Sequence, residues 1–341
     1  MSIIDIAKEA GVSITTVSRF FNQPEKLSED AARKVRATVD RLNYQPDIRR
    51  PGPKTAERVG IKTGNIAFLS LAAMSPEQML ELPAFPILLG GVQSSLLSKH
   101  LTMLMAHIGP NGRIPASIDP RNCDGVILFG APENPAVLKE LKRKLRKLPA
   151  VWCFRKHADP DHEFDHILYD NREVGGMAAN YLASRGHGRV AIFNADPEHE
   201  AFLTRVEHFE VRAKQLGLET TLFCPPEGFT GNQVQAFRYD AMEFLKKDRR
   251  ITGAFFCADD IMLGVHNELR ALGFDTSKLD SIGCNADEIL LRYLEPRPAT
   301  IDIKMAEIGI LAVDNLLRRI NGEQGGYHSE IFIKPELVPG K

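Results

Sequence analysis

The stretch EAGVSITTVSRFFN (residues 9–22) decides how the N-terminal end of the chain folds. Gly11 ends a short amphipathic helix expected over residues 3–10, because glycine takes the left-handed conformation that turns one helix into the next. Ser13 can cap the second helix by accepting a hydrogen bond from one of its first N–H groups. Val17, six residues after the glycine, is placed to pack where the two helices cross. This spacing predicts a helix-turn-helix.

The second helix carries polar positions that suit the major groove of DNA. Thr15, Thr16 and Ser18 are short hydrogen-bond donors and acceptors. Arg19 can address a guanine edge or a phosphate, and Ile14 can touch a thymine methyl group. The alternative is a corner between two ordinary helices of an all-α fold, and the polar positions favour the DNA-reading helix over it.

A third helix is expected after residue 28. Ser28 can cap it, and Glu29 and Asp30 occupy the first turn, where the helix dipole favours negative charge. Its apolar positions are expected to complete a small core and its basic positions to stay outside; the former are Ala32, Val35, Val39 and Leu42, the latter Arg33, Lys34, Arg36 and Arg41.

Charge is distributed unevenly along the chain. Residues 1–62 contain 12 Lys and Arg against 8 Asp and Glu, whereas the whole chain contains 43 and 44, so the first part is +4 and the rest −5. A basic N-terminal unit suits a polyanion such as DNA. A unit this small binds DNA weakly alone, so we expect a homodimer that reads two half-sites.

Residues 3–46, IIDIAKEAGVSITTVSRFFNQPEKLSEDAARKVRATVDRLNYQP, resemble the DNA-binding headpiece of the lactose-repressor (LacI/GalR) family of bacterial transcription regulators. The resemblance implies that the recognition helix meets base edges and nearby phosphates with Ile14, Thr15, Thr16, Ser18 and Arg19. It also implies that Ser13, Asn22 and Tyr44 hold the DNA backbone.

The segment after the headpiece departs from that family. Relatives usually continue into a hinge helix, whereas this chain reads YQPDIRRPGPKTAERVGIKTGN. Pro46, Pro51 and Pro53 exclude a helix as far as residue 53, because proline lacks the N–H donor and disfavours helix at the preceding residue. An extended basic arm with Arg49 and Arg50 in an A·T-rich minor groove is one interpretation, and a plain charged linker is the other.

From residue 65 onward, short apolar runs alternate with helical patterns, which predicts parallel sheets with helices on both faces. The pattern restarts near residue 172, so two lobes are expected, with a ligand cleft where the strand ends of both lobes face each other. The last elements are expected to recross the lobes. The expected fold is therefore an N-terminal three-helix helix-turn-helix domain plus an α/β two-lobed body of the periplasmic-binding-protein type I fold, with two doubly wound parallel sheets.

The expected domains follow from these patterns. They are a headpiece (1–47), an atypical Pro/Arg-rich hinge linker (48–64) and an effector-binding and dimerisation domain (65–341), whose N-lobe takes 65–170 and 299–322 and whose C-lobe takes 171–298 and 323–341.

Several body segments, among them FFCADDIMLGVHNELRALGF, look like the effector-binding core of the same family. The resemblance places Arg205 at the arginine that closes on the effector and Asp260 at the acidic residue opposite it. An Arg–Asp pair can grip adjacent hydroxyls or a carboxylate. A surface or interlobe salt bridge is the alternative for each residue.

Aromatic residues near strand ends or in loops on the cleft side are further candidates, because a ring can stack on a sugar or a base. They are Phe85, Trp152, Phe154 and Phe229, and ordinary core packing is the alternative for each. Asn285 is a candidate as well. It lies in Gly-Cys-Asn-Ala (283–286), where relatives commonly read Gly-aromatic-Asp-Asp, and the family's Arg-x-x-Gly-Phe becomes Arg-Val-Glu-His-Phe (205–209). A small sugar-like or related effector is expected, of unknown identity.

The remaining patterns exclude other classes. No apolar run is long enough for a membrane helix and no signal peptide is recognised, so we expect a cytoplasmic, nucleoid-associated protein without a membrane partner. The five scattered cysteines argue against disulfides or a zinc site, and HADPDHEFDH (157–166) is expected to be a polar loop rather than a metal site. Nucleophile-elbow, Walker and dinucleotide-binding motifs are missing, so neither enzymatic activity nor a cofactor is expected.

These observations predict a sequence-specific transcription regulator. A repressor is favoured over an activator. It is expected to bind a pseudo-palindromic DNA operator as a homodimer and to respond to a small-molecule effector. An α/β enzyme with an appended DNA-binding domain is the alternative.

Overall fold

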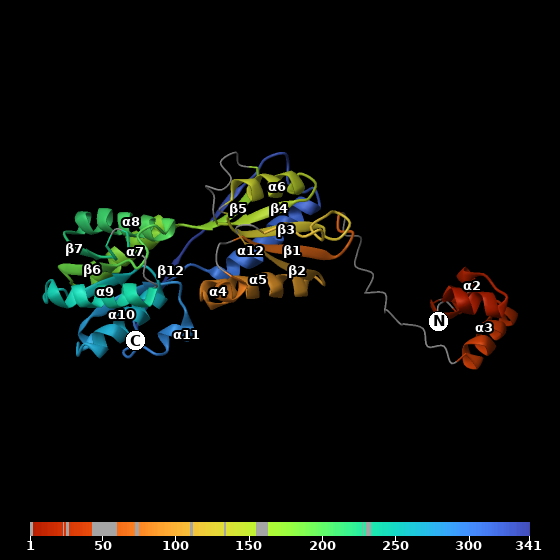
Figure 1. The fold of residues 1–341 in the computed structure, drawn as a ribbon, viewed down its shortest axis with the longest axis horizontal. Coiled ribbons are helices and arrows are strands. Elements are labelled where there is room, and N and C mark those ends of the chain that lie inside the picture. The colour runs from red at the N-terminus through yellow and green to blue at the C-terminus, as the bar shows by residue number, and fades with distance from the viewer. Residues whose placement is uncertain are drawn as a thin grey trace. The chain divides into compact units, whose positions relative to one another are not determined.

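The computed structural model describes residues 3–22, 24, 27–42, 60–71, 75–109, 112–132, 134–154, 163–226, 228–229 and 233–341. The chain divides into two compact units, residues 1–58 and residues 59–341 (Figure 1). We call them the headpiece and the body.

The headpiece consists of three helices, α1 (Ile3–Ala10), α2 (Ile14–Asn22) and α3 (Glu29–Arg41). The core of the headpiece consists of Ile6 and Ala7 from α1, Val17 from α2 and Val35 from α3. Thr38 is also buried, and its hydroxyl donates to the carbonyl of Lys34 (3.0 Å). The expected inward face of α3 is therefore confirmed at Val35, with Val39 and Leu42 packing against the core from its rim.

The turn between α1 and α2 has the predicted conformation. Gly11 adopts φ +64°, and the N–H of Val12 donates to the carbonyl of Ala7 (3.0 Å), which closes the end of α1. Ser13 caps α2, because its Oγ accepts the N–H of Thr16 (3.1 Å).

The body contains two six-stranded sheets, which we call sheet A and sheet B. Sheet A has the order β11-β5-β4-β3-β1-β2, from β1 (Asn65–Leu71), β2 (Thr102–Ile108), β3 (Gly125–Gly130), β4 (Ala150–Cys153), β5 (Asp165–Tyr169) and β11 (Glu330–Ile333). Sheet B has the order β12-β10-β9-β8-β6-β7, from β6 (Arg189–Phe193), β7 (Glu219–Phe223), β8 (Gly253–Phe256), β9 (Asp280–Cys284), β10 (Ala299–Asp302) and β12 (Glu336–Val338). Only the β10–β12 pairing is antiparallel among the pairings that the described strands make.

Helices cover both faces of each sheet. With sheet A lie α4 (Pro76–Glu81), α5 (Ala84–Ser98), α6 (Pro135–Leu145) and α12 (Met305–Ile320); with sheet B lie α7 (Asn171–Ser184), α8 (Glu200–Leu216), α9 (Gln233–Lys246), α10 (Asp259–Ala271) and α11 (Glu288–Leu291). Successive side chains of β3 point to opposite faces of sheet A, so each face needs a helical cover. Ile127 points to the core shared with α5 and α12, whereas its neighbours Val126 and Leu128 point to the core shared with α6.

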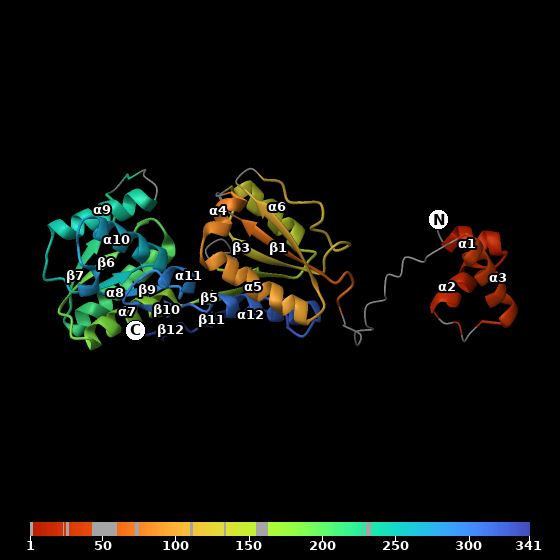
Figure 2. The same cartoon turned by 90° about the horizontal axis from the view of Figure 1, so that it is seen from below.

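The long helix α12 packs tightly against α5, and both views show the two helices side by side (Figures 1 and 2). A Cβ placed on Gly91 would lie 2.1 Å from the carbonyl oxygen of Ala306, so only glycine permits this approach. The contact attaches α12 to the lobe that contains sheet A.

The expected lobe boundaries are wrong in two places. Residues 299–302 were expected in the N-lobe, but β10 pairs with β9 in sheet B. Residues 330–333 were expected in the C-lobe, but β11 pairs with β5 in sheet A. The chain therefore crosses between the lobes after β5, after β10 and after β11, as the predicted recrossing requires (Figure 1). Within the described part of the chain, no helix is both long and apolar enough to cross a membrane.

Candidate DNA interface and effector site

The outward face of α2 carries the expected DNA-reading residues. Ile14 is 52% exposed, and Thr15 and Arg19 are exposed as well, whereas Val17 between them is fully buried. Thr16 and Ser18 are half-buried. An exposed isoleucine beside polar residues has no core to join within the headpiece, so this face is available to a partner.

Ser13 and Thr16 form a hydrogen-bonded pair at the start of α2. Their hydroxyl oxygens lie 2.8 Å apart, and the Oγ of Ser13 also accepts the N–H of Thr16. When Thr16 donates its hydroxyl proton to Ser13, the proton of Ser13 is free for a DNA phosphate. Either hydroxyl can be the donor of this pair, so the contact orients both side chains at the start of α2.

The basic residues of α3 are exposed as expected, but several are paired. Arg33 and Lys34 contact Asp30 at 2.8 and 2.9 Å, and their hydrogen bonds, that of Lys34 first, lower the pKa of the Asp30 carboxyl. Arg41 reaches Glu9 in α1 at 2.8 Å. Among the described residues Arg19 makes no such ion pair, so its full charge is available to DNA.

Four of the expected DNA contacts cannot be located. The side chain of Asn22, and Tyr44, Arg49 and Arg50 entirely, lie outside the described residues. Both interpretations of the Arg49–Arg50 segment therefore stay open.

Arg205 on α8 lies at the carboxyl ends of both sheets and is only 2% exposed. Its Nε donates to Asn171 Oδ1 (2.8 Å), its Nη2 to the Tyr169 hydroxyl (3.2 Å) and its Nη1 to the carbonyl of Cys257. Tyr169 is the last residue of β5, and Cys257 directly follows β8. The arginine therefore connects the end of one sheet to the end of the other.

Asp260, expected opposite Arg205, begins α10 together with Asp259. Burial raises the pKa of the partly exposed Asp260 carboxyl, while hydrogen bonds from the backbone N–H groups of Ile261 and of Asp260 itself and, to a smaller extent, the charge of Arg205 oppose this shift. Asp259 is fully buried and accepts the N–H of Asp287 (2.9 Å) and the hydroxyl of Thr300 (2.8 Å). Its burial raises its pKa to about 8. Asp259 is therefore held inside the protein, whereas Asp260 carries the partly exposed carboxyl at this end of sheet B.

Strained backbone marks the same end of the sheets. Asn285, which directly follows β9, has φ 112°, and Ala286 has φ 56°. Phe154, which directly follows β4, has φ 65°. Positive φ at residues other than glycine costs on the order of 1–3 kcal/mol each and clusters at functional sites.

The aromatic candidates divide into two groups. The Phe154 ring, which is half-buried, meets Phe129 (5.9 Å between centroids) and Tyr169 (5.3 Å). Phe229 is 36% exposed in the loop after β7. Among the described residues, no ring contact joins it to the row formed by Phe129, Phe154 and Tyr169.

The prediction that Phe85 contacts the effector is wrong, because this residue lies in the core at 1% exposure. Its ring centroid lies 6.0 Å from that of Phe68 and 5.0 Å from that of Phe129. Trp152 is also buried, and its indole N–H donates to the carbonyl of Gly130 (2.6 Å). Core packing, the alternative stated for both, holds.

Sequence reasoning missed three aromatic residues that lie beside Arg205 or Phe154. Tyr169 is the last residue of β5 and Phe129 is the last but one of β3. Phe202 lies one helical turn before Arg205, with its ring 5.6 Å from the guanidinium carbon. Tyr169 places its ring 5.7 Å from the same carbon. An aromatic residue at the end of a parallel strand was the available signal, since strand ends line ligand sites in such sheets.

The histidines, cysteines and carboxylates of the described residues form no competing metal site. No cluster of three or more His, Cys, Asp or Glu there has metal-binding geometry, and residues 157–162 of the polar loop lie outside the description. The five cysteines are free.

Comparisons with known proteins show which families and structures the chain is similar to. A model for bacterial regulatory proteins of the lacI family matches residues 2–47, and a model for the periplasmic binding protein-like domain matches residues 179–341. The HTH-type transcriptional repressor PurR of Photorhabdus laumondii subsp. laumondii is 28% identical over 354 residues, which cover 99% of this chain and 95% of that protein. The PurR repressor of Pectobacterium carotovorum subsp. carotovorum is 26% identical with the same coverage.

Solved structures share the fold. A complex of the transcriptional regulator CelR with cellobiose has a TM-score of 0.66 at 20% identity and covers 100% of this chain and 99% of that chain. The lac repressor dimer bound to operator and the anti-inducer ONPF has a TM-score of 0.68 at 17% identity, with coverages of 100% and 98%.

Proposed function

The chain belongs to the lacI family of bacterial regulatory proteins and is a DNA-binding transcriptional repressor, and we propose that it binds a pseudo-palindromic operator as a homodimer and responds to a small effector between its lobes. The outward face of α2 carries the proposal. On that face Ile14 is exposed and Arg19 is unpaired among the described residues, while Val17 anchors the helix from behind. Such a helix enters the major groove, and one headpiece reads one half-site.

Exposed apolar side chains on the body support pairing of two copies. Ile87 and Leu97 on α5 are 36% and 61% exposed, and Met105 on the edge strand β2 is 47% exposed. In the other lobe, Ile289 and Tyr293 at α11 are 63% and 65% exposed. Large exposed apolar residues gathered on one helix and its neighbouring strand are typical of a protein interface.

The effector is proposed to lie at the carboxyl ends of the two sheets, against Arg205, Asp260, Asn285 and the ring of Phe154. Aromatic rings beside an arginine and a carboxylate suit a ligand with one flat or ring-shaped face and several hydroxyl or carboxylate groups. A sugar-like molecule has this chemistry. An effector changes operator affinity only if it binds one arrangement of the lobes better than the other.

The proposed operator binding is tested by selecting sequences from random duplex DNA and measuring affinity by fluorescence anisotropy. Arg19→Ala is expected to weaken binding to the selected sequence by about 1–3 kcal/mol and to relax preference at one base pair if Arg19 reads a base. Arg33→Ala, which removes an exposed arginine paired with Asp30, serves as the control and is expected to change affinity little. Selection that recovers no preferred sequence would refute the proposal.

The enzyme alternative is not retained. The relatives that cover the whole chain are named as repressors, and the protein is a regulator rather than an enzyme. A repressor of bacterial genes works on DNA in the cytoplasm, so we place the protein there, in association with the nucleoid.

A further inference from the structure

The last residues of the expected hinge linker (48–64) are bound to the body by one carboxylate. Asp124 directly precedes β3 and is 7% exposed. Its Oδ1 accepts the N–H of Lys62 (2.9 Å), and its Oδ2 accepts the N–H of Gly64 (2.7 Å). Thr63 donates its N–H to Oδ1 (3.0 Å) and its hydroxyl to Oδ2 (2.9 Å). Three consecutive linker residues are therefore attached to the body by a single side chain.

The charge of Asp124 strengthens this attachment. Burial alone would raise the pKa of its carboxyl, but the hydrogen bonds from Thr63, Lys62 and Gly64 bring that pKa below its usual value. The carboxyl is therefore ionised near pH 7, and hydrogen bonds to an ionised acceptor are shorter and stronger than those between neutral groups. The N–H of Asp124 also donates to the carbonyl of Asn65 (2.8 Å), so side chain and backbone bind the same segment.

The C-terminal end of α12 contacts the start of the same segment. A Cβ on Gly60, which has φ +99°, would lie 2.2 Å from the carbonyl oxygen of Ile320, the last residue of α12. That neighbour is backbone and cannot give way, so only glycine fits here. A Cβ on Gly125, the residue after Asp124, would lie 2.9 Å from Leu316 in the last turns of α12. Residues 60–64 therefore contact α12 at one end and Asp124 at the other.

The helix α12 connects this point to the other lobe. It contains 16 residues and is therefore about 24 Å long. Only Ile303 and Lys304 separate its first residue from β10 of sheet B, whereas its last residue contacts Gly60. One helix thus runs from the crossover between the lobes to the end of the linker.

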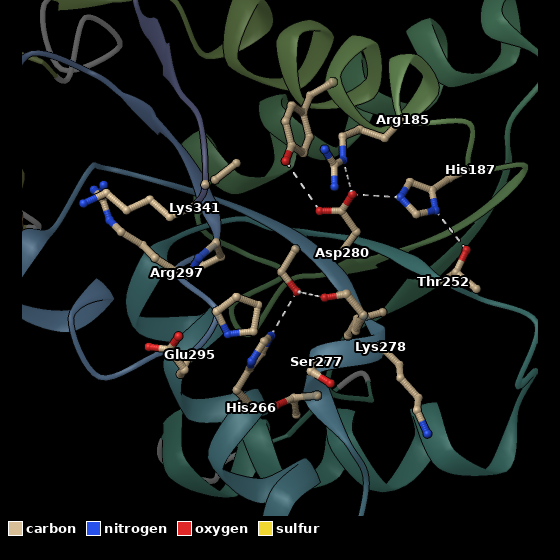
Figure 3. Close-up of a pocket in the computed structure, with 18 residues that line it drawn as sticks. Arg185, His187, Thr252, His266, Ser277, Lys278, Asp280, Glu295, Arg297 and Lys341 are labelled. Carbon is tan, nitrogen blue, oxygen red and sulfur yellow. Dashed lines mark hydrogen bonds and ion pairs between the residues drawn. The ribbon is translucent and has the colours of Figure 1, made fainter.

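The other lobe has a carboxylate in a comparable place. Asp280 is the first residue of β9, and it accepts hydrogen bonds from the Nε of Arg185 (2.5 Å), from His187 Nε2 (3.1 Å) and from the hydroxyl of Tyr181 (3.4 Å). Figure 3 shows Arg185 and His187 beside Asp280. These donors belong to the lobe of sheet B, and none of the hydrogen-bond donors to this carboxylate in the described part of the chain lies in the linker. Asp280 therefore stabilises its own lobe, whereas Asp124 holds the linker.

We propose that Asp124 is a positioning residue for operator binding, which fixes where the linker leaves the body and thereby the spacing of half-sites that the dimer accepts. This role rests on the proposed homodimer and its pseudo-palindromic operator. In such a dimer the two linkers start from fixed points on the paired bodies, and these points limit the distance between the headpieces. Releasing residues 62–64 from Asp124 gives each headpiece more reach, so the dimer then accepts other spacings.

The test measures, by fluorescence anisotropy, the affinity of the full chain for a selected operator and for versions with one, two or three base pairs added between the half-sites. Each added base pair turns one half-site by about 35° relative to the other. Asp124→Asn replaces the charged acceptor by a neutral amide, and Thr63→Val removes one hydrogen bond at nearly constant volume. Asp280→Asn is the matched control, because it weakens the carboxylate at the same end of the other sheet. Melting temperatures are recorded for all four proteins.

The wild type and Asp280→Asn are expected to bind the altered spacings about tenfold more weakly than the selected one. Asp124→Asn is expected to reduce this ratio to about threefold or less, with unchanged affinity for an isolated half-site, and Thr63→Val to give an intermediate ratio. A lower melting temperature without a change in the ratio is expected for Asp280→Asn only.

An unchanged ratio in both Asp124→Asn and Thr63→Val overturns the proposal, as does a wild type that selects paired half-sites but binds every spacing equally. A wild type that selects no paired half-sites refutes the proposed dimeric operator binding, and this inference with it, so the two failures are distinguishable. If Asp124→Asn folds poorly, the milder Thr63→Val decides.

Discussion

At the scale of single residues, Arg205 connects the ends of the two sheets at the proposed effector site. It is buried, yet all its hydrogen-bond partners are neutral, namely an amide, a hydroxyl and a carbonyl. Its charge is thus stabilised by dipoles and by the rings of Tyr169 and Phe202. A ligand with acceptor oxygens can replace some of these partners without leaving the charge unpaired.

Replacing Arg205 is expected to abolish the effector response. A thermal-shift screen of sugars, sugar acids and nucleobases on the wild type first supplies a ligand, and Arg205→Ala should then show no ligand-dependent change in operator affinity. The variant should also lose on the order of 1–3 kcal/mol of unfolding free energy, because buried acceptors are left unpaired. Arg212→Ala is the control, since Arg212 lies on the same helix and bonds Asn180 (2.7 Å) instead. A normal response in Arg205→Ala would remove this residue from the site.

A buried carboxyl makes stability depend on pH. Asp240 on α9 is fully buried, neither oxygen has a hydrogen-bond partner among the described residues, and burial raises its pKa to about 8. The folded state therefore binds this proton more tightly than the unfolded state, whose carboxyl has a pKa near 3.9. The contribution of this carboxyl to stability is lost as the pH rises between these two values and is constant outside them.

Asp240→Asn is expected to remove this penalty. Relative to the wild type, the variant should gain unfolding free energy by up to about 1.4 kcal/mol per pH unit between pH 4 and pH 8. Urea unfolding at pH 5 and pH 8 measures the difference. The same difference at both pH values would mean that the carboxyl is ionised in the folded state throughout this range.

At the scale of elements, the start of α2 combines three local devices within a few residues. Gly11 turns the chain, Ser13 caps the helix and Thr16 completes a hydroxyl pair with it. All three depend on neighbours in sequence, which explains why the pattern of residues 9–22 predicts the motif correctly. The aromatic row on the strand ends is different, because Phe129, Phe154 and Tyr169 meet only when three strands align.

Gly11→Ala is expected to lower the stability of the headpiece by about 1–2 kcal/mol. A Cβ at this position has nothing within 4 Å, so the cost comes from the left-handed backbone alone. Gly11→Asn should cost less, because asparagine tolerates this conformation better. Thermal unfolding of the headpiece followed by circular dichroism distinguishes the two. Equal losses would point to a steric clash instead of backbone strain.

At the scale of the whole molecule, the proposed homodimer would place two headpieces on one operator, which gives the exposed apolar surface of the body a role. Leu97 on α5 and Met105 on β2 belong to neighbouring elements of the same lobe. Burying apolar side chains of this size between two copies provides about 25 cal/mol per Å² before the costs of association.

Leu97→Asp combined with Met105→Asp is expected to convert the dimer into a monomer, which binds the full operator no better than a half-site. Sedimentation equilibrium and anisotropy on both DNA lengths measure this. Leu203→Asp is the control, because Leu203 is similarly exposed (49%) on α8 of the other lobe. A double variant that remains dimeric would place the interface elsewhere, with Ile289 and Tyr293 as the next surface to test.

The sequence by itself determined the helix-turn-helix and the existence of most strands and helices of the body, because turns, caps and apolar periodicity act over a few residues. It placed Arg205 and Asp260 at the effector site only through resemblance. The tertiary structure decided which sheet receives β10 and β11, that Phe85 belongs to the core, that Asp259 is buried and that Tyr169 accepts a hydrogen bond from Arg205. These outcomes depend on pairing between segments far apart in the chain, for example Glu330 beside His166, and no local pattern encodes such a partner.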